Sequence, residues 1–201
     1  LERYAEPLSA WAWATGEKYP QEYLWYSWRE VLRNHPHDDI CGCSVDAVHQ
    51  DMVNRFTRSL QVSEHLTDKH FRQIVEKVNT EAGYPGAPVM VFNPVNSTRT
   101  AAVKCHLGSY LETLNPEEPV AVVDSQGRPV VAQIQLHPVR EVTQWIDGQG
   151  YPRQSVEAEV EILAENLPPC GYETYTLTNY SGAQPQSTLA VGDDRIANEF
   201  Y

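Results

Sequence analysis

The feature that most constrains this chain is a change of pattern near Gly83. Before it, apolar residues recur every three to four positions, and the only glycines are Gly16 and Gly42. After it, short alternating runs rich in Val and Thr are interrupted by Pro and Gly. The first pattern is typical of amphipathic helices and the second of short antiparallel strands. The sequence therefore predicts an α+β chain, with a helical bundle over residues 1–83 and an antiparallel β-sandwich over residues 84–201.

Two helices are predicted from the N-terminal pattern. Residues 21–33 follow Pro20, which suits a first helical turn, and carry an aromatic-rich apolar face. Residues 45–79 form a much longer helix, with Ser44 as its N-cap and Asp46 in its first turn. The apolar stripe of this helix should pack against partner helices, and residues 1–14 are expected to supply part of one. The stripe consists of Val45, Val48, Met52, Phe56, Leu60, Leu66, Phe71, Ile74 and Val78.

The C-terminal pattern predicts strands separated by turns. Hairpin-type turns are expected at residues 124–127 and 147–150, where Asp and Gly cluster. Regularly spaced short strands of this kind favour a sandwich. The strands are expected at residues 88–92, 100–107, 120–123, 129–136, 139–146, 154–163 and 172–178.

Residues 34–44, with the sequence NHPHDDICGCS, concentrate polar side chains between the two helices. Pro36 excludes helix at the residue before it, so a loop is predicted. Imidazole and carboxylate are common zinc ligands, which makes His35, His37, Asp38 and Asp39 candidates. A solvent-exposed polar loop is the alternative interpretation. A zinc ribbon built on Cys41 and Cys43 is disfavoured because a second cysteine pair is missing.

This loop resembles the signature around the His-Asp pair of glycoside hydrolase family 38, in its bacterial branch, which includes mannosylglycerate-type hydrolases. The likeness continues through VDAVHQDM to Arg55 and Phe56. Shorter likenesses occur at EPLS (residues 6–9), at LPPCGY (167–172) and at NEFY (198–201), which resembles the entry to a further β domain. The resemblance implies an internal fragment of a zinc-dependent, retaining α-mannosidase, following a catalytic barrel and preceding other β domains. The missing initiator Met agrees with an internal fragment.

The resemblance assigns a role to two residues. His37 would ligate a single zinc ion, and Asp38 would accept hydrogen bonds from mannose hydroxyls. The nucleophile and the general acid would lie upstream, so the fragment by itself is expected to be inactive. Asp39 stands where many relatives are expected to have a small residue, and its carboxylate either supports the metal or faces solvent.

Composition limits the partners. A net charge of -12 disfavours nucleic acid and anionic membranes as partners, and no apolar run is long enough to cross a bilayer. No export signal is visible, so a cytoplasmic location with free cysteines is expected. Homo-oligomerisation stays open. The competing interpretation is a non-catalytic carbohydrate-binding or scaffold sandwich with a helical appendage, for which Trp145 and Tyr151 would provide exposed aromatics.

His49, His65 and His70 lie at helical spacing on the longer predicted helix. Their simplest interpretation is that all three are exposed on its surface.

Overall fold

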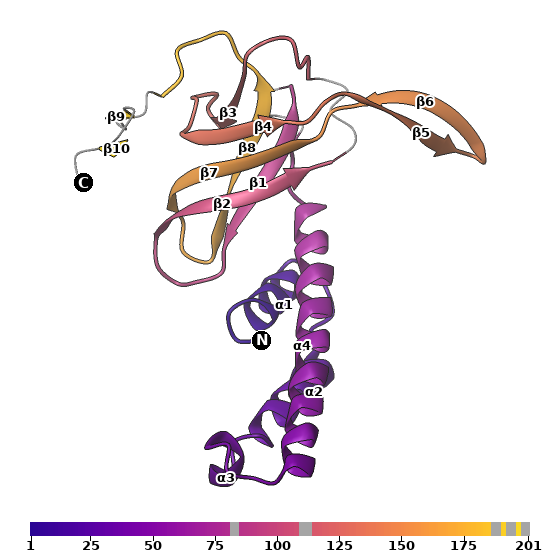
Figure 1. Cartoon of the computed structure of the whole chain (residues 1–201), viewed down its shortest axis with the longest axis vertical. Coiled ribbons are helices and arrows are strands. Elements are labelled where there is room, and N and C mark those ends of the chain that lie inside the picture. Colours follow the sequence, from indigo (N-terminus) through magenta and orange to yellow (C-terminus); the bar gives the residue numbers. More distant parts are fainter. Residues whose placement is uncertain (81–84, 109–113, 186–189, 192–195, 198–201) are drawn as a thin grey trace. The chain divides into compact units, whose positions relative to one another are not determined.

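The computed structural model describes residues 1–80, 85–108, 114–185, 190–191 and 196–197 (Figure 1). The chain divides into two compact units. One unit comprises Leu1–Asn79 with Pro94–Ser97, and the other comprises Thr80–Asn93 with Thr98–Tyr201. The boundary predicted at residue 83 lies outside the described residues. None of the described helices is long and apolar enough to cross a membrane.

The helical unit contains α1 (Ala5–Ala14), α2 (Gln21–Leu32), the single turn α3 (His37–Ile40) and α4 (Asp46–Val75). α1 and α2 each pack against the long helix α4 (Figure 1). The helices predicted at residues 21–33 and 45–79 are therefore confirmed, although α4 ends at Val75. The helix expected within residues 1–14 is α1.

The interior of the helical unit is built mostly from small and polar side chains. Ala5, Leu24 and Leu66 form its apolar cluster. Between α2 and α4, the buried Ser27 hydroxyl lies 2.7 Å from the Ser59 hydroxyl and 3.2 Å from the Ser63 hydroxyl. Short side chains let two helix backbones approach closely, and their hydroxyl groups keep hydrogen-bond partners inside the interface.

The prediction of an exposed His70 is wrong, whereas His49 and His65 are exposed as predicted. His70 is 1% exposed, and its Nδ1 lies 3.0 Å from the Ser9 hydroxyl of α1. The Ser9 hydroxyl in turn donates to the carbonyl of Ala5. His70 lies on the same buried face of α4 as Leu66 and Ile74. Helix α1 packs against α4 and covers His70 through Ser9.

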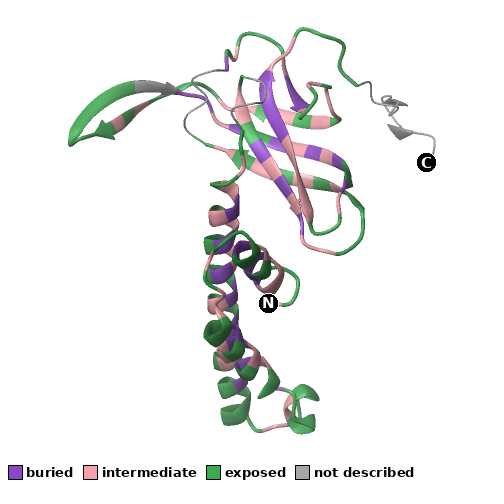
Figure 2. Ribbon diagram, turned by 180° about the vertical axis from the view of Figure 1, so that it is seen from behind, coloured by how far each residue is buried: buried purple, intermediate pink, exposed green. Residues whose placement is uncertain are grey.

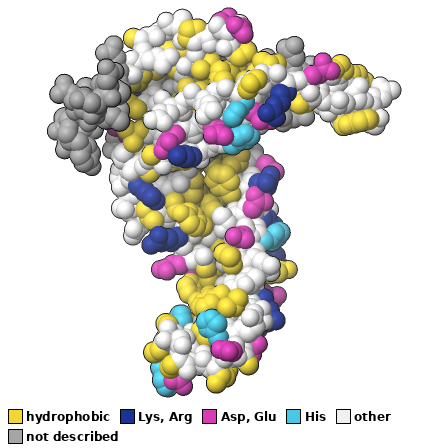
Figure 3. Space-filling view, viewed as in Figure 1, with side chains coloured by type: hydrophobic (Ala, Val, Ile, Leu, Met, Phe, Trp, Pro, Cys, Tyr) yellow, Lys and Arg dark blue, Asp and Glu magenta, His cyan; other side chains and the backbone are white. Residues whose placement is uncertain are grey.

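The apolar stripe of α4 is only partly buried, which corrects the expectation that all of it packs on partner helices. Met52, Leu66 and Ile74 are buried, whereas Phe56 and Leu60 are 45% and 57% exposed. The reason is that Ser59 and Ser63, rather than the larger neighbours, face α2. Figure 3 shows apolar side chains on the surface of the helical unit.

The β unit is a sandwich of two three-stranded antiparallel sheets, as predicted. One sheet has the order β1 (Ala87–Asn93), β8 (Gly171–Asn179), β3 (Val120–Asp124), and the other has the order β2 (Arg99–Leu107), β7 (Ala158–Leu167), β4 (Ala132–Leu136). β7 buries Val160 and Ile162 while its alternate residues face outward. Together with Val122 and Leu177 of the opposite sheet, these residues form one apolar core (Figure 2).

The segment predicted as one strand from 129 to 136 takes part in both sheets. The amide of Val130 donates to the carbonyl of Val122 at 2.9 Å, so the chain first pairs with β3. From Ala132 it pairs with β7 in the other sheet. The predicted turn at residues 124–127 is present, with Gly127 at φ 76° and its amide bonded to the Asp124 carbonyl.

The strand predicted at 154–163 is in fact the end of one strand and the start of another. β5 (Arg140–Ile146) pairs with β6 (Gln149–Ser155) in a separate hairpin, and β7 begins at Ala158. The turn holds only Asp147 and Gly148, both at positive φ, as a two-residue hairpin of type I′ requires. Two short strands, β9 (Ala190–Val191) and β10 (Ile196–Ala197), form a further pair. The NEFY segment at 198–201 lies outside the described residues.

Candidate functional site

The loop predicted to carry the chemistry starts from an anchored residue. Asn34 is fully buried at the end of α2, and its Nδ2 donates to the Met52 carbonyl of α4 at 2.9 Å. Its Oδ1 accepts from Arg55 Nη1 at 3.2 Å. Both ends of this amide are therefore bonded to α4, and the start of the loop is held against that helix. Asn34 belongs to the motif, but its anchoring role could not be read from the sequence.

Within the loop, residues 37–40 form the single helical turn α3. Pro36 precedes it with an extended ψ of 146°. The turn closes with Gly42 at φ 74°, whose amide donates to the Asp39 carbonyl, while the Cys43 amide donates to the Asp38 carbonyl. These two bonds form a Schellman motif, which favours glycine at the left-handed position. The loop is therefore more ordered than predicted, without continuing α2 into α4.

Ser44 does not cap α4, contrary to the prediction. The N-cap is Val45, with an extended backbone and no side-chain cap bond. The Ser44 hydroxyl instead lies 3.9 Å from the Met52 sulfur. Asp46 does occupy the first turn of α4, where a carboxylate is stabilised by the helix dipole.

His37 and Asp38 lie side by side on α3. His37 Nε2 is 3.3 Å from Asp38 Oδ1, and the side chains are 91% and 67% exposed. Cys43 Sγ lies 3.6 Å from the same Asp38 oxygen. Asp39, on the next position, is half-buried. The structure thus holds an imidazole and a carboxylate together on an anchored turn, with both groups open to solvent.

His37 and Asp38 by themselves are too few to hold a metal ion. Among the described residues, no group of three or more His, Cys, Asp or Glu side chains is placed to hold a metal ion. A structural zinc ion takes four ligands and a catalytic one at least three from protein. His37 and Asp38 have suitable donor chemistry, so they fit such an ion only if other residues supply the remaining ligands.

The cysteines are free within the described part of the chain, as expected. Cys41, Cys43 and Cys170 are exposed, and Cys105 is half-buried. Burial raises the pKa of the Cys105 thiol. The exposure of Cys41 and Cys43 follows from the one-turn helix, which leaves the end of the loop on the surface.

The two aromatics expected to form one exposed row lie on opposite faces of the β5–β6 hairpin. Tyr151 pairs with Gln144, whereas Trp145 pairs with Gly150. Since neighbouring residues of a strand point to opposite faces, Trp145 and Tyr151 cannot share a ligand as a single row. This removes the specific support for the carbohydrate-binding alternative that rested on the pair.

Comparison with known proteins identifies the class of the helical unit. Residues 1–74 match the family model of the alpha mannosidase middle domain. The match contains all four helices except the last residue of α4, and it includes the His37–Asp38 turn.

Matches to whole proteins agree with this assignment. A predicted mannosylglycerate hydrolase of Halalkalibacterium halodurans is 33% identical over 86 residues, which cover 43% of this chain and 10% of that protein. An alpha-mannosidase from Enterococcus faecalis V583 matches with a TM-score of 0.73 and 27% identity, over 93% of this chain and 23% of its own. A second Enterococcus faecalis structure, a protein in the glycosyl hydrolase family 38, matches with the same score and identity, over 94% and 24%. The chain thus resembles proteins of glycoside hydrolase family 38 over most of its length, and it spans about a quarter or less of the length of these relatives.

Proposed function

We propose that this chain is part of a zinc-dependent, retaining α-mannosidase, and that His37 and Asp38 are its contribution to the active site. The observation that carries the proposal is their placement. They project next to each other from an anchored turn, inside the region that matches the middle domain. A loop held by buried Asn34 and closed by Gly42 presents the two groups at low conformational cost.

His37 would ligate the zinc ion, together with residues outside the chain. A bound zinc ion would polarise hydroxyl groups of the mannose and help to orient the ring. Asp38 would accept hydrogen bonds from sugar hydroxyls, and its negative charge would make these bonds stronger than neutral ones. Both side chains are exposed enough to be reached by a ligand without moving another part of the loop.

The proposal places the attacking carboxylate and the general acid in a barrel upstream of residue 1. In this arrangement residues 1–83 are the middle domain, and residues 84–201 are a β domain that leads into another one. Large apolar side chains on the surface of the helical unit support a contact with a neighbouring domain. Trp25 of α2 is 66% exposed, and Leu32, five residues before His37, is 57% exposed. Exposed apolar groups of this size commonly mark an interface.

The substrate class proposed is an α-linked mannoside, either an oligosaccharide or a small compound such as mannosylglycerate. The 201-residue chain by itself should not hydrolyse such a substrate and should bind zinc weakly, because the residues that the structure describes supply too few ligands. Assay of the purified chain with an aryl α-mannoside tests this statement. Turnover by the chain alone would contradict it.

The zinc role is tested in the full-length protein with His37→Ala. Loss of one ligand should lower the zinc content, and added zinc should partly restore α-mannosidase activity. His49→Ala, which changes an exposed histidine on α4, is the matched control and should leave both quantities unchanged. Metal analysis and kinetics are measured on the same preparations. A His37→Ala enzyme with full zinc and normal turnover would end the proposal.

The substrate role is tested with Asp38→Asn, which keeps the shape of the side chain and removes its charge. Zinc content should stay near normal, while transition-state stabilisation falls by about 2–4 kcal/mol, the usual scale for a charged hydrogen-bond partner. An exposed polar loop without function would tolerate both changes. If the assignment is right, His37→Ala should lower the zinc content, whereas Asp38→Asn should lower turnover without loss of zinc. If it is wrong, neither quantity should change.

A further inference from the structure

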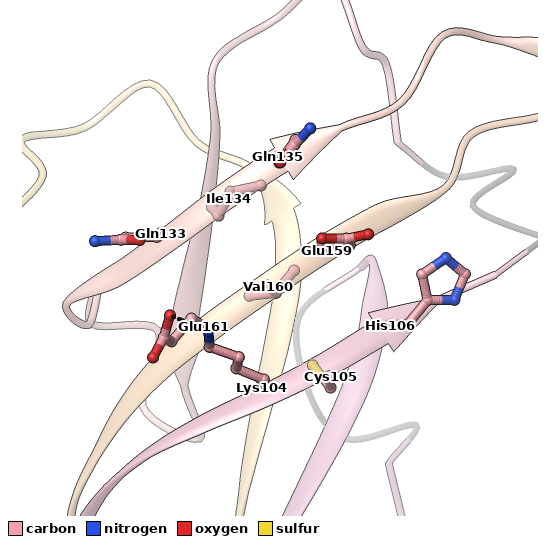
Figure 4. A pocket seen from close by; sticks show the side chains of 9 residues that line it. All are labelled: Lys104, Cys105, His106, Gln133, Ile134, Gln135, Glu159, Val160 and Glu161. Carbon is pink, nitrogen blue, oxygen red and sulfur yellow. Dashed lines mark ion pairs between the residues drawn. The ribbon is translucent and has the colours of Figure 1, made fainter.

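The outward face of the sheet β2–β7–β4 is hollowed. The hollow has a volume of about 530 Å³, and its rim is formed by side chains of all three strands (Figure 4). Small-molecule sites in proteins commonly have about 300–1,000 Å³. The opposite face of the same sheet forms the apolar core, so the backbone beneath the hollow is held firmly.

The strand register arranges the polar side chains of this face in two cross-strand rows. In each row a carboxylate of the central strand β7 lies between a basic side chain of β2 and an amide of β4. The rows are separated by two residues along each strand, or about 7 Å. The first row is Lys104, Glu161 and Gln133, and the second is His106, Glu159 and Gln135.

Both carboxylates have basic neighbours and yet remain accessible. Glu161 Oε2 lies 3.4 Å from Lys104 Nζ, and the Glu161 side chain is 34% exposed. Glu159 Oε1 lies 3.5 Å from His137 Nε2, and the Glu159 side chain is 61% exposed. With neutral histidines, the rows carry two negative charges and one positive charge. An anionic ligand is therefore disfavoured, and an uncharged ligand meets little net field.

We propose that this face binds a neutral oligosaccharide through its hydroxyl groups. A carboxylate can accept hydrogen bonds from two adjacent hydroxyls, an amide both donates and accepts, and an ammonium group donates. The first row offers all three kinds of group. The second row, at a fixed spacing, offers the next sugar unit a carboxylate, an amide and the imidazole of His106, which can donate and accept. The residues lining the hollow include no Trp, Tyr or Phe to stack on a sugar ring, so the affinity should be weak, with Kd about 1 mM. This site is separate from His37 and Asp38 and does not depend on the proposed function.

The test is a titration of the purified 201-residue chain with α-linked mannobiose, with maltose as a second disaccharide, followed by amide NMR shifts. At about 20 mM disaccharide, well above the expected Kd, binding should approach saturation. The largest changes in amide chemical shift should then fall on residues of β2, β4 and β7. The double variant Glu159→Gln with Glu161→Gln keeps side-chain size and should weaken binding about tenfold or more, since two charged acceptors are lost. The double variant Glu117→Gln with Glu141→Gln changes the same net charge at exposed positions outside the hollow and should bind normally.

A second pair of changes, Gln133→Ala with Gln135→Ala, removes the amides and should also weaken binding. Dispersed NMR spectra establish that each variant is folded. The proposal is overturned if the shifts at about 20 mM are absent from these three strands. It is equally overturned if the glutamate-to-glutamine pair inside the hollow binds as tightly as the pair outside it.

Discussion

The two units of this protein are stabilised in different ways. The β unit buries a continuous set of large aliphatic side chains between its sheets, among them Val122, Ile162 and Leu177 at 0% exposure. The helical unit buries serines, an asparagine, a histidine and a glutamate beside a smaller apolar cluster, and it leaves Trp25, Leu32 and Leu60 exposed. A buried hydrogen-bond network adds directional contacts but contributes little net free energy for each bond, whereas apolar burial is additive and non-directional.

The difference matches what each unit has to do. A sandwich closed by apolar contacts can fold as a self-contained block. In the helical unit, polar contacts determine the position of the loop that carries His37 and Asp38, through the bonds of Asn34 to α4. Its exposed apolar surface agrees with the proposal that another part of the full-length protein covers it.

The largest effect is expected from Ile162→Ala in the β core. The side chain is completely buried in the central strand β7, so its removal leaves a cavity between the sheets. The free energy of unfolding of the β unit should fall by about 2–5 kcal/mol, measured by urea denaturation followed by circular dichroism. A loss below about 0.5 kcal/mol, the range of surface changes, would show that the β core is not the close-packed block described.

A smaller effect is expected from Glu30→Ala in the helical unit. The Glu30 side chain is 3% exposed and lies 3.1 Å from Arg33 Nη1 and 3.6 Å from Arg58 Nη1. Both arginines are more than half exposed, so water can take the place of the lost carboxylate. The helical unit should lose about 1–2 kcal/mol. Glu64→Ala, at an exposed position of α4, is the control. An equal loss of stability in both variants would show that the buried Glu30 carboxylate does not stabilise the helical unit.

The next effect is a pH dependence confined to the helical unit. Burial, reinforced by the charges of Lys69 and His65 and opposed by that of Glu17, lowers the pKa of His70. The unfolded chain therefore takes up a proton at a higher pH than the folded chain does, and stability should decrease as the pH falls below about 6.5. His70→Gln should remove this part of the acid sensitivity, and His49→Gln should not. Unfolding curves recorded between neutral and mildly acidic pH measure this pH dependence. An unchanged acid sensitivity in His70→Gln would show that His70 is not its source.

The smallest effect is expected from Leu60→Ser on the exposed part of α4. The side chain is 57% exposed, so the stability of the isolated chain should change by less than about 0.5 kcal/mol. Self-association at high concentration should decrease, because an exposed apolar group is removed. Denaturation and light scattering on the same samples provide the measurement. A large loss of stability would mean that Leu60 is buried and that the two units differ less than described.

Local patterns were sufficient to predict many of the elements. Helical spacing identified α2 and α4, and the change of period near Gly83 separated helices from strands. Most strands were found within one or two residues, because alternating side chains and turn residues act locally. The residue types of the loop at residues 34–44 are enough to make it the candidate site, and its likeness to family 38 agrees with the match of residues 1–74 to the alpha mannosidase middle domain.

Other features depended on which elements meet in space. Nothing in the periodicity of α4 distinguishes His70, which α1 covers, from His65, which is exposed. In the same way, Ser59 and Ser63 face α2 while the apolar Leu60 stays outside. Spacing along a helix determines which residues share a face, but the neighbouring helix determines which face is buried.

The same distinction holds for the β unit and for both candidate sites. The sequence alone predicted that strands exist, and it identified His37 and Asp38 as side chains whose groups suit a metal ion and sugar hydroxyls. Only the tertiary structure decided that the chain leaves β3 at Val130 for the other sheet, and that Lys104, Glu161 and Gln133 form one row. Backbone conformation is governed by neighbours in sequence, whereas cross-strand register and burial are set by contacts between residues far apart in the chain.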